Sequence, residues 1–169
     1  FTEKGRVLPL KTYELRPDTS RNTRGTPLIN VIPLKSDDKV NAVVSVSDLD
    51  AENTFLVMGT REGAIKRVSL ASINTLNKRR SGLNIMNLQA TDELVTARVA
   101  KETDDVVMIS QQGMSIRFSL SDITARQRAA GGVRGMEIRP KKVKGNKKPI
   151  KDYIVGMSII DSESDSKLF

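Results

Sequence analysis

The sequence predicts an all-β fold made of four-stranded blades, as in a β-propeller. Related segments recur at a spacing of about 50 to 60 residues, and each repeat contains four short apolar stretches bounded by turn residues. Four short strands per repeat of this length are typical of a propeller blade, and propellers close with about four to eight blades. The 169 residues hold fewer blades than that, so the predicted propeller is incomplete.

The third and fourth strands of each repeat begin at glycines. The third-strand segments are Gly5-Arg-Val-Leu-Pro-Leu, Gly63-Ala-Ile-Lys-Arg-Val-Ser-Leu and Gly113-Met-Ser-Ile-Arg-Phe-Ser-Leu. About twenty residues later come Gly25-Thr-Pro-Leu-Ile-Asn-Val, Gly82-Leu-Asn-Ile-Met-Asn-Leu and Gly132-Val-Arg-Gly-Met-Glu-Ile. Apolar residues alternate with polar ones in the latter set, which predicts fourth strands with one buried face.

The first and second strands complete each repeat. First strands are expected from Asp38, Asp92 and Asp152, and the apolar runs Phe55-Leu-Val-Met and Val106-Val-Met-Ile lead through short turns into the next glycine, as in hairpins. A two-sheet sandwich is the alternative. Burial between sheets is predicted for Phe55, Val57, Met86, Leu88, Val107, Ile109, Ile116 and Phe118.

The repeat divides the chain into four parts. Residues 1–36 are expected to be the end of a first blade, 37–91 a second blade and 92–151 a third blade with a basic insertion at 140–149. Residues 152–169 would begin the next blade and form a tail. The natural unit is therefore expected to be longer than this sequence.

The composition excludes much catalytic chemistry. The sequence has no cysteine and no histidine, so thiolate nucleophiles, Cys/His zinc sites and Ser-His-Asp arrangements cannot be built. No phosphate-binding Gly-x-x-x-x-Gly-Lys-Ser/Thr loop occurs, and Tyr13 and Tyr153 are interpreted as strand residues. We expect no catalytic residue, no metal and no cofactor in this chain, no membrane contact, and a reducing cytoplasm as its location.

Charge follows the repeat. The formal net charge is +8, with +5 in residues 61–80 and +9 in 126–151, against −4 in 37–52 and −3 in 92–105. Basic residues thus gather on the third strand and the loop into the fourth, whereas acidic residues gather on the first strand and the following turn. A surface that is merely solubilised has no reason to sort charge by strand, so a polyanionic partner is favoured.

The basic residues are expected to form a ladder of phosphate contacts along one rim. The loop candidates recur once per blade, and the third strand adds outward-facing positions. The candidate DNA-binding residues are Lys11, Arg16, Arg21, Arg24, Arg67, Lys78, Arg79, Arg80, Arg117, Arg126, Arg128 and Arg134. Aromatic residues make up only 4% of the chain, which disfavours recognition of single strands by stacking and leaves duplex DNA as the expected partner. The insertion 140–149 is either a solvated loop or an arm that touches DNA.

Several motifs together resemble the C-terminal domain family of the DNA gyrase A protein and its topoisomerase IV relative. They are Gly5-Arg-Val-Leu-Pro-Leu-Lys-Thr-Tyr-Glu-Leu, Ser20-Arg-Asn-Thr-Arg-Gly, Leu56-Val-Met-Gly-Thr-Arg-Glu-Gly-Ala-Ile-Lys-Arg, Asp92-Glu-Leu and Ala129-Ala-Gly-Gly-Val-Arg-Gly. The resemblance implies a six-bladed β-pinwheel whose basic rim wraps DNA, of which this chain holds about three blades.

The same resemblance implies a role within a larger enzyme. The chain would present DNA to the cleavage core of a bacterial-type, ATP-dependent topoisomerase, with the remainder of the gyrase A protein and the ATPase gyrase B protein as partners in a nucleoid-associated heterotetramer. Gyrases of this kind carry a Gln-Arg-Arg-Gly-Gly-Arg-Gly-type box that this sequence lacks. A topoisomerase IV-type domain with weak bending, or an interaction propeller that binds an acidic protein partner, are therefore the alternatives.

Overall fold

A computed structural model describes residues 1–17, 20–22, 24–78, 80–140 and 149–161. Within these ranges the chain is all-β, with short 3-10 helices in its connections and no α-helix. The strands are β1 (Arg6–Val7), β2 (Thr54–Thr60), β3 (Ala64–Ser69), β4 (Leu83–Asn84), β5 (Leu94–Lys101), β6 (Asp105–Ser110), β7 (Ser115–Ser119), β8 (Val133–Arg134) and β9 (Ile154–Ile160). The 3-10 helices are η1 (Thr12–Glu14), η2 (Leu28–Asn30), η3 (Ala71–Lys78) and η4 (Leu120–Asp122).

Each of the two larger sheets contains one hairpin. β2 pairs with β3 and β6 pairs with β7, each antiparallel, as the second and third apolar stretches of the repeat predicted. Both turns end on a glycine with positive φ, +91° at Gly63 and +79° at Gly113. Only at Gly63 is the backbone also crowded, because a Cβ there would lie 2.2 Å from the carbonyl oxygen of Met136.

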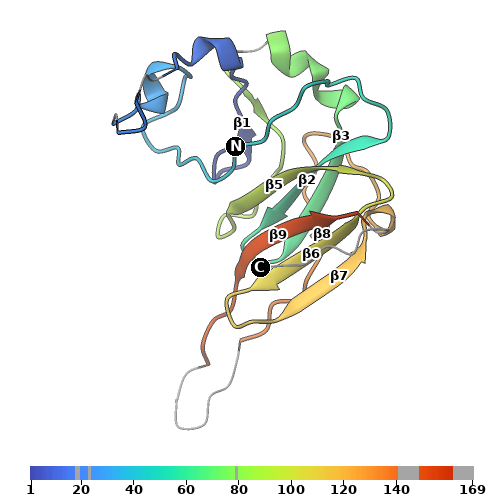
Figure 1. The fold of residues 1–169 in the computed structure, drawn as a ribbon. Coiled ribbons are helices and arrows are strands. Elements are labelled where there is room, and N and C mark those ends of the chain that lie inside the picture. The colour runs from blue at the N-terminus through green and yellow to red at the C-terminus, as the bar shows by residue number, and fades with distance from the viewer. Residues whose placement is uncertain (18–19, 23, 79, 141–148, 162–169) are drawn as a thin grey trace.

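The sheets draw their strands from more than one repeat. The strand orders are β5-β2-β3-β8, β7-β6-β9 and β1-β4 (Figure 1). The four-stranded sheet, for example, takes β2 and β3 from one repeat and β5 and β8 from the next. Sheets therefore run across the repeat boundaries at 36/37, 91/92 and 151/152, and those boundaries remain a prediction about the sequence repeat alone.

An aspartate at the start of each first strand fastens the hairpin turn of the preceding repeat. The Asp92 carboxylate accepts the backbone N–H of Glu62 at 2.9 Å, and the Asp152 carboxylate accepts that of Gln112 at 3.0 Å. The corresponding Asp38 of the second blade instead forms an ion pair with Arg6 of the preceding one. These contacts explain physically why the acidic residue recurs with the period of the strands.

Apolar clusters cover both faces of the four-stranded sheet. Leu56 and Met58 belong to a cluster on the side of the N-terminal segment, whereas Phe55 and Val57 belong to a cluster shared with the β7-β6-β9 sheet. Burial is confirmed for four of the eight predicted positions: Phe55, Val57, Met86 and Val107. Leu88 and Phe118 are half-buried.

The burial prediction is wrong for Ile109 and Ile116, which are 36% and 38% exposed. Ile116 lies opposite Met108 on the inward face, but β7 is an edge strand in the described sheet, so one side of Ile116 has no neighbour. Ile109 lies in β6 next to Met108 and therefore points to the face of this sheet that lies away from the cluster containing Met108.

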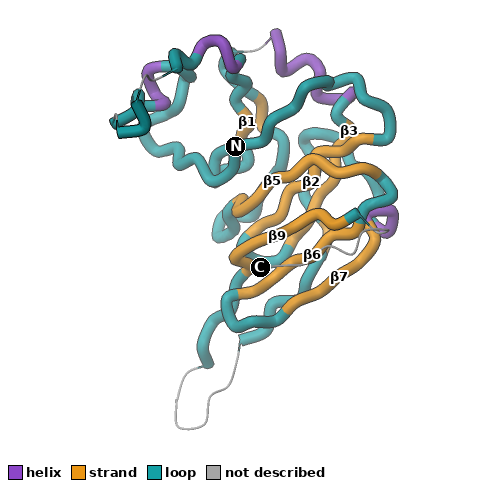
Figure 2. The backbone as a smooth tube through the Cα atoms, in the orientation of Figure 1, coloured by secondary structure: helices purple, strands orange, loops and turns teal. Residues whose placement is uncertain are grey.

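The N-terminal segment departs most from the predicted strands. The expected first strand from Asp38 is reduced to one bridge between Thr2 and Val40, and the expected fourth strand from Gly25 contains η2 instead. Figure 2 shows this region mainly as loop. β5, by contrast, pairs with β2 from Thr54 to Thr60. Strand conformation thus appears where a neighbouring strand supplies hydrogen-bond partners.

Candidate nucleic-acid interface

Three loops follow the third strands, and each lies next to the loop of the neighbouring repeat. We call the segments 12–27, 71–82 and 121–132 the loop row. Arg80 of the second loop donates to the Glu14 carboxylate of the first at 3.2 Å, and Arg128 of the third donates to Thr75 Oγ1 of the second at 3.4 Å. Each loop therefore contacts the next, and basic side chains from successive repeats, Arg80 and Arg128, make those contacts.

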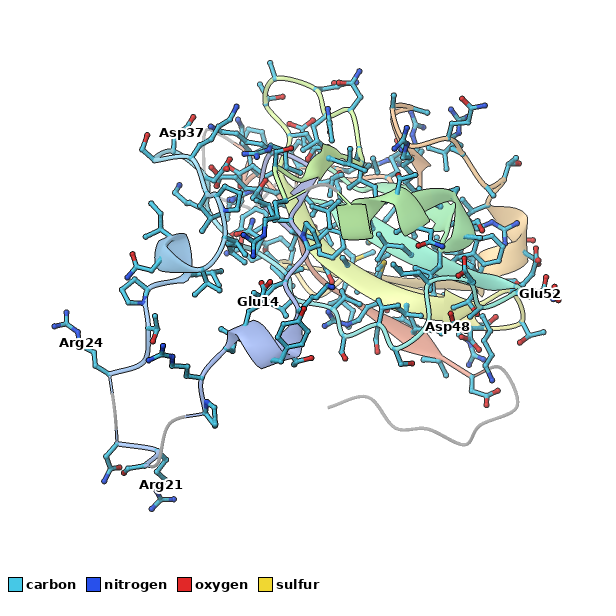
Figure 3. The ribbon with its side chains drawn as sticks, turned by 90° about the horizontal axis from the view of Figure 1, so that it is seen from above. Glu14, Arg21, Arg24, Asp37, Asp48 and Glu52 are labelled. Carbon is cyan, nitrogen blue, oxygen red and sulfur yellow. The ribbon has the colours of Figure 1, made fainter. Side chains whose placement is uncertain are left out.

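Most described arginines of the loop row are open to solvent. Arg16, Arg21, Arg24, Arg80 and Arg126 are exposed, and Arg128 is half-buried beneath its contact with Thr75. Figure 3 shows Arg21 and Arg24 on a segment that extends well away from the sheets. Exposed guanidinium groups at such positions can approach a phosphate backbone without displacing core residues.

Two of the predicted loop residues lie outside what the structure describes. Lys78 ends η3, but its side chain is not described, and neither is Arg79. The basic insertion is also outside the described residues from 141 to 148. Their role in DNA binding stays a prediction.

Arg67 is not available to DNA, contrary to the sequence prediction. It is 6% exposed, its guanidinium donates to Glu102 at 3.0 Å, and it stacks on the Phe55 ring at 4.6 Å. The alternation along β3 placed Arg67 on an outward face, but that face is covered by the second apolar cluster. Because both faces of this sheet are buried, alternation along the strand does not distinguish an exposed face from a buried one.

Three further candidates lie outside the loop row or at its start. Arg117 is exposed on β7 and donates to Asp105 at 2.7 Å, and Arg134 is exposed on β8 opposite Ala64, at the hairpin end of the sheet. Lys11 precedes η1, exposed, with its Nζ 5.7 Å from the Tyr13 ring centroid. The structure therefore groups Lys11 with the loop row and separates Arg117 and Arg134 from it.

Sequence reasoning missed Lys66, which lies beneath the third loop. It is 0% exposed, and its Nζ donates to the carbonyl oxygens of Ile85, Arg128 and Ala130. Burial, assisted by the nearby Arg126 charge, lowers the pKa of Lys66 to about 8. The sequence did contain one indication that Lys66 is unusual: it lies three residues after the turn glycine, where the other two repeats have the apolar residues Leu8 and Ile116.

Acidic turns meet the sheets at the same end as the loop row. Asp50 accepts a hydrogen bond from Asn74 of η3 at 2.6 Å, and the carbonyl of Asp104 accepts from Leu120. The acidic turns precede β2 and β6, whereas the loops leave from the paired strands β3 and β7, so acidic turns and basic loops are neighbours at this end of the sheets. In Figure 3, Asp48 and Glu52 lie across the molecule from Arg21 and Arg24 of the first loop, whereas η3 of the second loop lies on their side.

Other kinds of site find little support in the described residues. No three His, Cys, Asp or Glu side chains among them cluster so that they could hold a metal. No helix in the same part of the chain is long and apolar enough to cross a membrane. The interpretation of both tyrosines as strand residues is wrong, because Tyr13 lies in η1 and Tyr153 directly precedes β9. The Arg61 guanidinium covers Tyr153, 4.1 Å from its ring centroid.

Comparisons with known proteins point to one family. The family model described as DNA gyrase C-terminal domain, beta-propeller, matches residues 1–47, 54–101 and 104–161. The DNA gyrase A protein of Staphylococcus epidermidis is 35% identical over 168 residues, which are 99% of this chain and 17% of that protein. The DNA gyrase A protein of Clostridium acetobutylicum is 39% identical over 135 residues, 80% of this chain and 16% of that protein.

Solved structures give the same fold. The C-terminal domain of DNA topoisomerase IV is similar with a TM-score of 0.73 and 25% identity, over 96% of this chain and 46% of that domain. The DNA gyrase A C-terminal domain follows with a TM-score of 0.68 and 18% identity, over 92% of this chain and 45% of that one. The chain thus spans about a sixth of its curated relatives and about half of these domains. The family match and the propeller-type sheets together show that the chain belongs to the DNA gyrase C-terminal domain family.

Proposed function

We propose that this chain binds duplex DNA along the loop row and bends it. The observation that carries the proposal is the pair of contacts, Arg80 with Glu14 and Arg128 with Thr75, that sets basic loops of successive repeats side by side. A row of guanidinium groups spaced by the repeat suits the regular charge of a DNA backbone, which is one negative charge per about 1.7 Å of duplex.

Duplex DNA is favoured over single strands by the state of the aromatic rings. Phe55 and Tyr153 are covered by arginines, so neither offers a free face on which a base could stack. Tyr13 is 78% exposed, but a single ring does not make a stacking platform. Contacts from arginine to phosphate carry no sequence information, so binding should depend little on base sequence.

Within a larger protein, the chain would act as the DNA-wrapping module of a type IIA topoisomerase of the gyrase A kind. The names of the relatives support this, and the net charge of +8 suits the task. Strand cleavage and ATP hydrolysis would then belong to the remainder of the gyrase A protein and to the gyrase B protein, in the cytoplasm. This chain would supply the curved duplex that the cleavage core receives.

A salt titration tests the proposal. Bending a duplex through a quarter to a half turn costs on the order of 5 to 10 kcal/mol, so several phosphate contacts per loop are needed to offset it. The wild-type protein should bind short duplexes with a log-log salt slope of about −5 to −8, near −0.9 per phosphate. Replacement of Arg80, Arg126 and Arg128 by alanine should flatten the slope by about two to three units and reduce bending, read by end-to-end energy transfer.

A matched variant controls for net charge. Lys39, Arg61 and Arg98 are also exposed, and none of them belongs to the loop row. Their combined replacement by alanine removes the same charge and should change the slope by less than about one unit. Equal effects of the two triple variants would contradict a DNA surface on the loop row. If the wild type binds an acidic protein but no duplex, the interaction-propeller alternative is favoured.

A further inference from the structure

The ammonium of Lys66 is buried in a cage of backbone carbonyls. Its donors reach Ile85 O at 2.7 Å, Arg128 O at 2.6 Å and Ala130 O at 2.7 Å. The three N–H bonds of the ammonium are thereby matched by three acceptors. Because Ile85 follows β4 and the other two acceptors lie in the third loop, one side chain on β3 joins two segments that are distant in sequence.

This arrangement costs free energy that a simpler core would avoid. Among the described residues no carboxylate pairs with Lys66, and the charged neighbour that acts on it is Arg126, which repels it. A buried cation with no counterion is retained only where its hydrogen bonds compensate for lost hydration. At the equivalent third-strand positions the other repeats carry Leu8 and Ile116, which make no such bonds. Of the three repeats, only this one therefore has a cation at this position, and it is the one whose third strand lies beneath the third loop.

The segment that Lys66 holds carries two arginines of the loop row. Arg126 is bonded through its backbone N–H to the carbonyl of Arg67 at 3.0 Å, and Ala130 through its N–H to Gln127 at 3.1 Å. The Arg128 side chain reaches Thr75 at 3.4 Å. Lys66 binds the carbonyls of residues 128 and 130, and the backbone of Arg67 binds that of Arg126, so two neighbouring residues of β3 hold the stretch from which both arginines project.

We propose that Lys66 is a positioning residue of the nucleic-acid interface: its buried ammonium fastens residues 126–130 to β3, so that Arg126 and Arg128 face the same duplex. This rests on the proposed function of the loop row. Lys66 itself touches no DNA, since its side chain has no solvent-exposed surface.

Amide hydrogen exchange without DNA tests the fastening. In the intact protein, Lys66→Met removes the donors while keeping an apolar side chain of similar length. The backbone amides of Arg126, Ala130 and Asn87, which are hydrogen-bonded in or to this loop, should exchange at least tenfold faster. Lys66→Arg keeps a cation with several donors and should restore much of the protection. Lys101→Met, at an exposed lysine, should leave these amides unchanged. Unchanged exchange in folded Lys66→Met would overturn the proposal.

Duplex binding tests the positioning. Lys66→Met should flatten the salt slope by about one to two units, as expected for the loss of the two phosphate contacts. Adding Lys66→Met to Arg126→Ala/Arg128→Ala should produce little further change, since the three residues act through the same contacts. Fully additive effects would overturn the positioning role.

If Lys66→Met does not fold, Lys66→Gln, which is shorter and keeps at most two donors, carries the test. Wild-type exchange together with a wild-type slope in that folded variant would overturn the proposal. A wild type that binds no duplex would refute the proposed function, while the exchange result would still decide the fastening.

Discussion

The two larger sheets contain the same repeat in different surroundings. β3 lies between β2 and β8 and has an apolar cluster on each face, whereas β7 pairs only with β6 in the described sheet. The residues at equivalent positions of β3 and β7 therefore differ in burial. Lys66 and Arg67 are buried on β3, while Ile116 and Arg117 are exposed on β7.

This difference reverses the usual relation between residue type and burial. The two charged side chains are inside, and an isoleucine at an equivalent position is partly outside, because the number of neighbouring elements differs between the sheets. Each buried charge has its own contacts, three carbonyls for Lys66, and a carboxylate and a ring for Arg67, whose Nε has no hydrogen-bond partner among the described residues. Surroundings thus decide what the same repeat position contributes, and the following substitutions test that conclusion.

The glycines of the two hairpin turns should show the largest contrast. Gly63→Ala places a Cβ against the Met136 carbonyl and adds a left-handed backbone strain, and should lower the free energy of unfolding by about 4 kcal/mol. Gly113→Ala has the same strain but no atom within 4 Å, and should cost only about 1 kcal/mol. Denaturant midpoints of the two variants measure the difference. Equal losses would show that backbone strain alone matters and that the sheets do not differ.

Lys66 should make stability depend on pH. Burial lowers its pKa from 10.5 to about 8, so between these values the unfolded chain binds more protons than the folded chain. The free energy of unfolding should therefore rise with pH through this window, by at most about 3 kcal/mol in total. Lys66→Met should lack this rise, whereas Lys101→Met should keep it. Unfolding at pH 8, 9 and 10 measures the effect, and identical profiles for all three proteins would contradict it.

The paired arginines should show a smaller contrast. Arg67→Ala breaks a partly buried bond to Glu102 and leaves a gap over Phe55, and should cost about 2 to 3 kcal/mol. Arg117→Ala breaks an exposed pair with Asp105 and should cost less than about 1 kcal/mol. Adding Glu102→Ala to Arg67→Ala should cost little more, which a double-mutant cycle would measure. A larger loss at Arg117 than at Arg67 would reverse the comparison.

The loop row could be predicted in part. The recurrence of Arg16, Arg80 and Arg126 after each third strand indicated a basic edge, and the structure brings these loops into contact. The sequence could not show that Arg67 is buried. Alternation along a strand tells which residues share a face of the sheet, but it does not tell whether other residues pack against that face. Nor could the sequence identify Lys66, since its acceptors are backbone carbonyls that any residue carries.

What the sequence by itself determined is the repeat: four apolar stretches per unit, glycines at the turns, an aspartate at each first strand and charge sorted by strand. These features depend on neighbours along the chain, so a one-dimensional pattern records them. Only the tertiary structure decided that β8 joins β3, that β5 joins β2, and that residues 40–46 form no regular strand. Pairing between strands depends on partners that are distant in sequence, and a strand without a partner has no hydrogen bonds to maintain it.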